Sequence, residues 1–203
     1  MIAWAIEAAR SSALFDHIVV STEDPDVARI AREAGADVPF VRPASLADDA
    51  TSTDAVLLHA LGECERAYGD VEFGCCIYPT VPFLTTEALA RGLALLRNEH
   101  AAACFPVVRY DFPIEQAFTL HGAHPRPEWP DKLLARSQDL PEHYHDAGMF
   151  YWVDASRFLA DPRIFNAQSV AFIISPDEAQ DINTPEDWAR AELKLAILRA
   201  RGR

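Results

Sequence analysis

An acidic and an amide side chain stand two positions apart near the end of the chain, at Asp181 and Asn183. Residues two apart on an extended chain point to the same side, so their side-chain oxygens can share one Mg²⁺ ion. The same segment also has the pattern of a helix start, with Thr184 as the cap and Pro185 at the first helical position. Both interpretations can hold together, and Asp181 is therefore the candidate catalytic residue and, with Asn183, the candidate metal ligand.

Arg42 follows a short apolar run, Val38–Val41, that is expected to be a strand. Open α/β sheets bind their ligands where strands end, and a planar guanidinium there is suited to hold a nucleotide. In the alternative, Arg42 is a surface residue that pairs with Asp48 or Asp49.

Two threonine hydroxyls, those of Thr51 and Thr53, stand where a helix is expected to begin, over Ser52–Tyr68. Hydroxyl residues are favoured as helix caps because their oxygen accepts a backbone N–H of the first turn. A capping role and a ligand-binding role are compatible at such a position.

The segment Tyr78-Pro79-Thr80 ends the expected strand Phe73–Tyr78, and Pro82 follows closely. Proline cannot continue a strand ladder, so the chain must leave the sheet here and can open a pocket. The alternative is a simple strand-ending turn.

His145 and Asp146 precede Gly148 at the expected start of another strand, Gly148–Val153. An aspartate in that position can orient a sugar hydroxyl, and a histidine can meet a carboxylate. In the alternative, Asp146 satisfies the backbone of a turn. The aromatic residues that follow, 150–152, are expected to serve packing.

The composition is that of a soluble globular protein: half of the 203 residues are hydrophobic, and the net charge is −13. This acidity argues against a nucleic-acid partner, which needs a basic surface. No apolar run long enough for a membrane span and no secretory signal is visible. The four cysteines have no metal-binding spacing, and a reducing cytoplasm is the expected setting.

Apolar runs alternate with helical patterns along the chain, as in a mostly parallel sheet covered by helices. We expect one domain over 1–203, with an irregular proline-rich insertion over 110–145. The expected strands are His17–Thr22, Val38–Val41, Phe73–Tyr78, Ala102–Val108, Gly148–Val153 and Val170–Ile174. Helices are expected over 1–12, 25–35, 52–68, 85–99 and 185–198.

Five segments, in this order and at these separations, resemble one enzyme family: MIAWAIEAA, FDHIVVSTEDPDVARIAREAGADVPFVRPASLADDATST, CCIYPTVPFL, RSQDLPEHYHDAGMFYW and QDINTPEDW. They resemble the cytidylyltransferases that make CMP-activated nonulosonic acids, and the HDAG-x-FYW segment is closest to the pseudaminic acid branch.

The resemblance implies an α/β, Rossmann-like three-layer nucleotidyltransferase fold and a homodimer in which the irregular region reaches the partner subunit. It implies transfer of CMP from CTP to a nine-carbon acidic sugar, with pseudaminic acid as the expected sugar, with release of pyrophosphate and with Mg²⁺ as cofactor.

The resemblance also assigns residues to roles. Arg42, Thr51 and Thr53 occupy nucleotide-recognition positions. The positions for sugar binding are Tyr78, Pro79, Thr80, Gln138, His145, Asp146 and Met149. Relatives commonly carry glutamine at the position of Met149, and aspartate at both Asp181 and Asn183.

The strand and the glycine-containing phosphate loop that open this family are not found ahead of Met1, and the chain starts with helical residues. We therefore expect a longer native product. Two alternatives remain: a catalytically inactive remnant that binds sugar or acts as a scaffold, and the same enzyme class acting on sialic or legionaminic acid.

Overall fold

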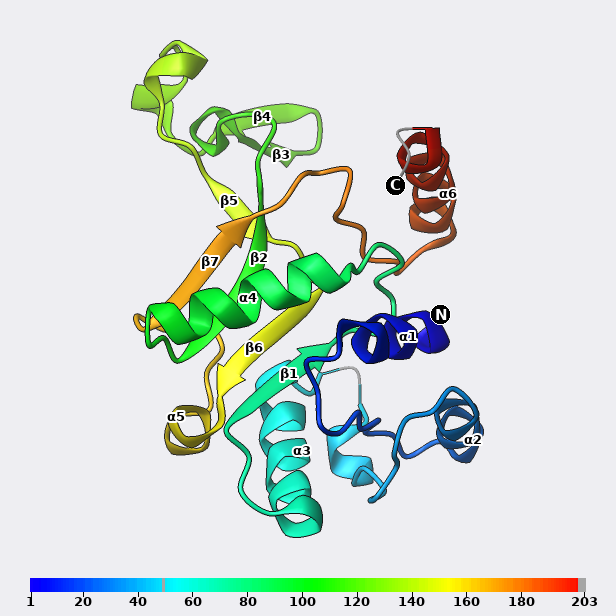
Figure 1. The fold of residues 1–203 in the computed structure, drawn as a ribbon. Coiled ribbons are helices and arrows are strands. Elements are labelled where there is room, and N and C mark those ends of the chain that lie inside the picture. The colour runs from blue at the N-terminus through cyan, green and yellow to red at the C-terminus, as the bar shows by residue number, and fades with distance from the viewer. Residues whose placement is uncertain (49, 201–203) are drawn as a thin grey trace.

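A five-stranded sheet organises the computed structural model, which describes residues 1–48 and 50–200 (Figure 1). The edge strand β1 (Phe73–Ile77) pairs with β6 (Phe150–Asp154), which pairs in turn with the first part of β2 (Ala103–Arg109). The second part of the same β2 edge pairs with β5 (Tyr144–Asp146), and the other edge pairs with β7 (Ser169–Ile173).

Strands β5 and β6 are two parts of one bent segment. Gly148 lies between them with a φ of +62°, a conformation that residues with a side chain rarely adopt. The bend carries the chain from the outer half of β2 across to β1, so that β6 lies between β1 and β2. Beyond the ladder, the N–H of Tyr78 still donates to the carbonyl of Met149 over 3.0 Å.

Helices cover both faces of the sheet, which gives three layers. Alternate residues of β6 point to opposite faces. Phe150 and Trp152 pack with α4 (Thr86–Asn98), while Tyr151 and Val153 pack with the helices on the other side. The remaining helices are α1 (Ile2–Ser12), α2 (Pro25–Glu33), α3 (Thr53–Tyr68), α5 (Ala155–Ala160) and α6 (Pro185–Ala200). Helix α1 lies on the α4 side, and α3 and α5 lie on the Tyr151 side.

The expected helices are confirmed, and local capping explains where they begin. Asp24 caps α2, Ser52 caps α3 and Thr85 caps α4, each through a side-chain oxygen that accepts a backbone N–H of the first turn. At α6, Thr184 and Asp187 cap reciprocally. Within the described residues, none of these helices has the length and apolar character needed to cross a membrane.

The strands expected over His17–Thr22 and Val38–Val41 are wrong. The two segments make a single parallel bridge, between Val19 and Asp37, held by backbone hydrogen bonds of 2.8 and 2.9 Å. A strand needs a continuous ladder. Beyond the bridge, the N–H of Arg42 donates to the carbonyl of Thr22 over 3.0 Å as a separate hydrogen bond, and residues 18–22 face a cavity on the other side.

The expectation of a mostly parallel sheet is also wrong for the ladders between described residues, of which β2–β7 alone is parallel. The strands β1, β2 and β7 do run in one direction, as a parallel sheet requires. Strand β6 separates β1 from β2 and runs against both, which makes its two ladders antiparallel.

The region 110–145 is less irregular than expected. It contains a hairpin of β3 (Phe118–His121) and β4 (His124–Pro127), followed by two short 3₁₀ turns and then β5. The two turns after the hairpin are Pro130–Lys132 and Ser137–Asp139. Another 3₁₀ turn, Ile114–Gln116, lies before the hairpin, and one outside this region is Ala44–Leu46. In Figure 1 the hairpin and the turns after it project beyond the upper ends of β2 and β5.

We expect Gly92→Ala to destabilise the protein. Gly92 lies inside α4, where alanine would normally favour the helix by about 1 kcal/mol. An added Cβ would stand 2.8 Å from Trp152 and 3.1 Å from Phe150. Because Trp152 is buried and its indole donates to the carbonyl of Leu89, it cannot move aside, and overpacking should cost about 1–3 kcal/mol. Urea unfolding measures the change.

Gly62→Ala in α3 is the matched control, because a Cβ there would meet no atom within 4 Å. It should raise the free energy of unfolding by about 0.5–1 kcal/mol. Equal effects of the two substitutions would contradict the packing described for α4.

Candidate active site

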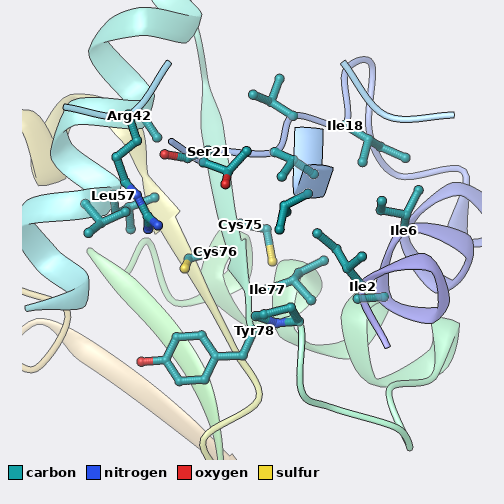
Figure 2. Close-up of a pocket in the computed structure, with 18 of the residues that line it drawn as sticks. Ile2, Ile6, Ile18, Ser21, Arg42, Leu57, Cys75, Cys76, Ile77 and Tyr78 are labelled. Carbon is teal, nitrogen blue, oxygen red and sulfur yellow. The ribbon is translucent and has the colours of Figure 1, made fainter. Parts of the chain in front are cut away.

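A cavity of about 570 Å³ lies between β1 on one side and α1, the segment 17–24 and α3 on the others (Figure 2). Figure 2 shows Arg42 and Leu57 on one wall and Ile2, Ile6 and Ile18 on the opposite wall. Cys75 and Cys76 of β1 lie between the two walls. The cavity follows the edge of β1 that is not paired with β6, and no strand among the described residues pairs there.

The two ends of the cavity differ in chemistry. The end near α1 is apolar, lined by side chains such as Ile2, Ile6 and Ile77. The other end is polar. It is lined by Ser21, Thr22, Glu23, Asp24, Arg42, Thr51, Thr53 and Tyr78. The nucleotide-binding residues expected from the sequence all lie at this polar end.

Arg42 forms an ion pair with Glu23 at this end. Its Nε donates to Glu23 Oε2 over 2.9 Å, and its Nη2 donates to the same oxygen over 2.5 Å. Two hydrogen bonds to one oxygen fix the orientation of the guanidinium. The Arg42 hydrogen bonds lower the pKa of Glu23, which keeps the carboxylate charged. The ion-pair partner of Arg42 is therefore Glu23 and not Asp48, the partner expected from the sequence. The other expected partner, Asp49, lies outside the described residues. Arg42 is the one arginine or lysine in the described lining of the cavity.

Thr51 and Thr53 approach the cavity at the start of α3. The Thr51 hydroxyl donates to Asp48 over 2.7 Å, and Ser52 rather than Thr51 caps the helix. The Thr53 hydroxyl is 2.6 Å from the hydroxyl of Tyr78. The positive end of the helix dipole therefore faces the polar end of the cavity, an arrangement that favours anions.

A second group of side chains meets just beyond the end of β1. The Thr80 hydroxyl donates to Asp181 Oδ1 over 2.9 Å, and the Asn183 amide donates to Asp181 Oδ2 over 2.8 Å. Gly148 lies against the same carboxylate, where a Cβ would be 3.7 Å from the Asp181 Cβ. The fold thus brings together residues from three segments that are far apart in the sequence.

The oxygen donors of this group match the preferences of a hard cation, but they do not enclose one. Carboxylate and hydroxyl oxygens are typical Mg²⁺ ligands, and Mg²⁺ in phosphate-binding sites usually takes one or two carboxylates plus phosphate oxygens. The Asn183 amide presents its N–H to Asp181, so a shared ion would require the amide to turn. No cluster of three metal-ligating side chains is found in the described part of the chain. The residues therefore fit a cation held largely by its substrate.

Asp146 lies at the end of β5 and is joined to Tyr151 of β6, whose hydroxyl donates to Asp146 Oδ2. The other oxygen, Oδ1, is buried and has no hydrogen-bond partner among the described residues. Sequence reasoning assigned Tyr151 to packing and missed this contact. The signal was the alternation along the strand, which puts Tyr151 on the opposite face from Phe150 and Trp152.

Three of the expected sugar-binding residues lie apart from these two groups. His145 is exposed, with its ring edge-on to Tyr110 and its Nδ1 2.8 Å from the carbonyl of Asp146. Gln138 is exposed in the projecting segment before β5. Met149 is 2% exposed and packs in the core on the α4 side. Their roles toward a substrate stay predictions.

The fold is that of known cytidylyl-transferring enzymes. A solved structure described as CMP:2-keto-3-deoxy-manno-octonic acid synthetase complexed with CTP matches with a TM-score of 0.65 at 13% identity. The match covers 98% of this chain and 88% of that chain. At this identity the likeness shows the fold alone, an α/β nucleotidyltransferase fold of the Rossmann-like kind.

Sequence comparison gives the family. Residues 1–183 match the family described as Cytidylyltransferase. A pseudaminic acid cytidylyltransferase of Campylobacter jejuni is 31% identical over 97% of this chain and 85% of its own length. An N-acylneuraminate cytidylyltransferase of Escherichia coli is 25% identical over 100% of this chain and 47% of its own length. The chain belongs to the cytidylyltransferase family.

Proposed function

We propose that this protein transfers CMP from CTP to a nine-carbon acidic sugar, with pseudaminic acid as the first candidate, and releases pyrophosphate. The segment Tyr78-Pro79-Thr80 is the observation that carries the proposal. Tyr78 lines the nucleotide end of the cavity and bonds Thr53, while Thr80, two residues later, bonds Asp181. One short turn thus joins a cavity suited to a nucleotide with a carboxylate suited to a phosphate-bound cation.

The reaction needs positioning and charge neutralisation more than covalent chemistry. The anomeric hydroxyl of the sugar forms a bond to the α-phosphorus and loses its proton to solvent, while the bond from the α-phosphorus to the bridging oxygen breaks. Pyrophosphate leaves with that electron pair. A cysteine nucleophile is not supported, because burial raises the pKa of Cys76 and Cys104 to about 12 and keeps both thiols neutral.

Asp181 is the residue that would hold Mg²⁺, with Thr80 and Asn183 orienting its two carboxylate oxygens. When bound, the ion supplies positive charge to the triphosphate and to the leaving pyrophosphate. Arg42 and the start of α3 would bind the nucleotide, and Asp146 would accept a hydrogen bond from the sugar.

We expect the purified chain to release pyrophosphate from CTP when pseudaminic acid and Mg²⁺ are both present. A coupled phosphate assay with pyrophosphatase measures the rate, and mass spectrometry identifies the CMP-sugar. Removing Mg²⁺ with EDTA should abolish release, because the net charge of −13 otherwise opposes two anionic substrates.

Sialic acid and legionaminic acid serve as competing substrates in the same assay. A preference of at least tenfold in kcat/KM for either of them would replace pseudaminic acid but keep the reaction class. If no acidic sugar of this kind supports pyrophosphate release while CTP binds, the transferase proposal fails and a sugar-binding or scaffold role replaces it.

We expect Arg42→Ala to raise the dissociation constant for CTP by about tenfold or more, because a charge-assisted hydrogen bond to the nucleotide is lost. Glu23→Gln should lower it by about two- to threefold, since the guanidinium no longer has to leave a competing carboxylate. Calorimetric titration with CTP and Mg²⁺ measures both constants and does not depend on turnover.

Arg29→Ala is the matched control, because Arg29 forms an exposed ion pair with Glu33 on α2. It should leave CTP binding unchanged. A change of less than twofold in Arg42→Ala would remove Arg42 from the nucleotide site.

The projecting region 110–145 supports a homodimer. It exposes large apolar side chains, with Phe112 at 81% and Leu134 at 95% exposure, and neighbouring residues of β3 are exposed as well. Large apolar side chains that are exposed on a projecting region favour contact with a partner surface. The four cysteines are free in the structure, which fits a reducing compartment such as the cytoplasm.

We expect light scattering to give twice the 22.5 kDa mass of one chain. The double variant Phe112→Asp, Leu134→Asp should scatter as a monomer with little change in thermal unfolding of the core. Leu193→Asp, an exposed leucine of α6, is the control and should stay dimeric. A monomeric wild type, or a double variant that stays dimeric, contradicts this assembly.

A further inference from the structure

Tyr151 is a polar residue in the middle of a buried strand, and its hydroxyl contacts a carboxylate. The side chain is 3% exposed and lies against the rings of Phe105 and Phe165, at centroid distances of 6.2 and 6.0 Å. Its hydroxyl donates to Asp146 Oδ2. Burial, and then the hydrogen bond to Asp146, raise the pKa of Tyr151, so the hydroxyl remains a donor at any working pH.

The contact restricts the Asp146 carboxylate. With Oδ2 hydrogen-bonded to Tyr151, the rotation of the carboxylate is restricted and Oδ1 is held on the other side of it. That oxygen is buried and unpartnered among the described residues, a costly state for a carboxylate unless a ligand supplies a donor. A sugar hydroxyl is a donor of the required kind.

Tyr151 is also connected to the nucleotide end of the site. Its ring meets the ring of Tyr78 edge to face at 5.5 Å, and the Tyr78 hydroxyl is 2.6 Å from that of Thr53. A continuous set of contacts therefore runs from the start of α3, through β1 and β6, to the end of β5. Packed aromatic rings hold such a set rigidly.

We propose that Tyr151 is a positioning residue for the sugar end of the site: its hydroxyl fixes Asp146 so that Oδ1 accepts a hydroxyl of the acidic sugar, in register with the nucleotide held near Thr53. The inference rests on the proposed function. Tyr151 itself does not touch the substrate, because its hydroxyl is occupied by Asp146 and its ring is enclosed.

The test removes the hydroxyl and keeps the ring, with Tyr151→Phe. The KM for the sugar should rise about tenfold, while kcat and the KM for CTP change by less than about threefold. A purely structural role would instead affect both substrates alike through loss of folded protein, which thermal unfolding monitors. Tyr68→Phe is the matched control, since Tyr68 also donates to a carboxylate, that of Asp37, at an exposed position.

A double-mutant cycle decides whether Tyr151 acts through Asp146. In an Asp146→Ala background, Tyr151→Phe should alter kcat/KM for the sugar by less than twofold, because the group that it positions is gone. A further tenfold loss in that background, or equal losses toward CTP and sugar in the single variant, overturns the proposal.

A readout independent of turnover separates this proposal from the proposed function. In protein labelled with ¹³C-aspartate, the carboxylate resonance of Asp146 should move in Tyr151→Phe and stay in place in Tyr68→Phe. An unmoved resonance overturns the positioning role whatever the activity. If the resonance moves but wild type turns over no acidic sugar, the contact stands and it is the proposed function that fails.

Discussion

The antiparallel ladder between β1 and β6 is the constraint on which the site depends. All five residues of β1 pair with β6, from Phe73 opposite Asp154 to Ile77 opposite Phe150, and Tyr78 adds one more backbone bond. Since side chains alternate along a strand, this register decides which residues of β6 enter each core layer. A slip by one residue would move Trp152 out of the α4 layer and Tyr151 into it.

The same register sets the geometry at the end of the ladder, where the candidate site lies. Beyond the pair of Tyr78 and Met149, Thr80 from one strand end and Gly148 from the other both lie against Asp181. Asp146 lies just before the bend, so it reaches back to Tyr151 across only five positions of sequence. Residues separated by about a hundred positions, such as Thr80 and Asp181, are thus brought together by one strand pairing.

The elements that could be predicted from sequence are those with local signals. Asp24, Ser52 and Thr85 stand before amphipathic segments, and each caps the expected helix. The strands predicted over 17–22 and 38–41 were wrong, because an apolar run becomes a strand only with a paired neighbour, and the pairing depends on distant parts of the chain.

Among the site residues, too, those with local sequence signals could be predicted, and contacts that depend on distant parts of the chain could not. Arg42 and Tyr78 were predicted from their places at element ends and Thr53 from the family resemblance, and all three line one cavity. Which carboxylate pairs with Arg42 could not be predicted, since Glu23 reaches it only after the loop over 34–42 folds back. The contact of Tyr151 with Asp146 was missed because it depends on the bend between β5 and β6, and the sequence signal for that bend is one residue, Gly148.

The balance of charged side chains at the candidate site also limits how it can bind its substrates. The candidate site contains more carboxylates than cationic groups: Glu23, Asp24, Asp146 and Asp181 against Arg42, whose charge Glu23 already offsets. Such a site repels two anionic substrates unless a divalent cation and backbone N–H groups outweigh the acids. In the proposed function the two carboxylates would have separate tasks, with Asp181 serving the cation and the phosphates and Asp146 serving a hydroxyl of the sugar. Discrimination between acidic sugars would therefore depend on hydroxyl geometry at Asp146 more than on attraction of the sugar's own charge.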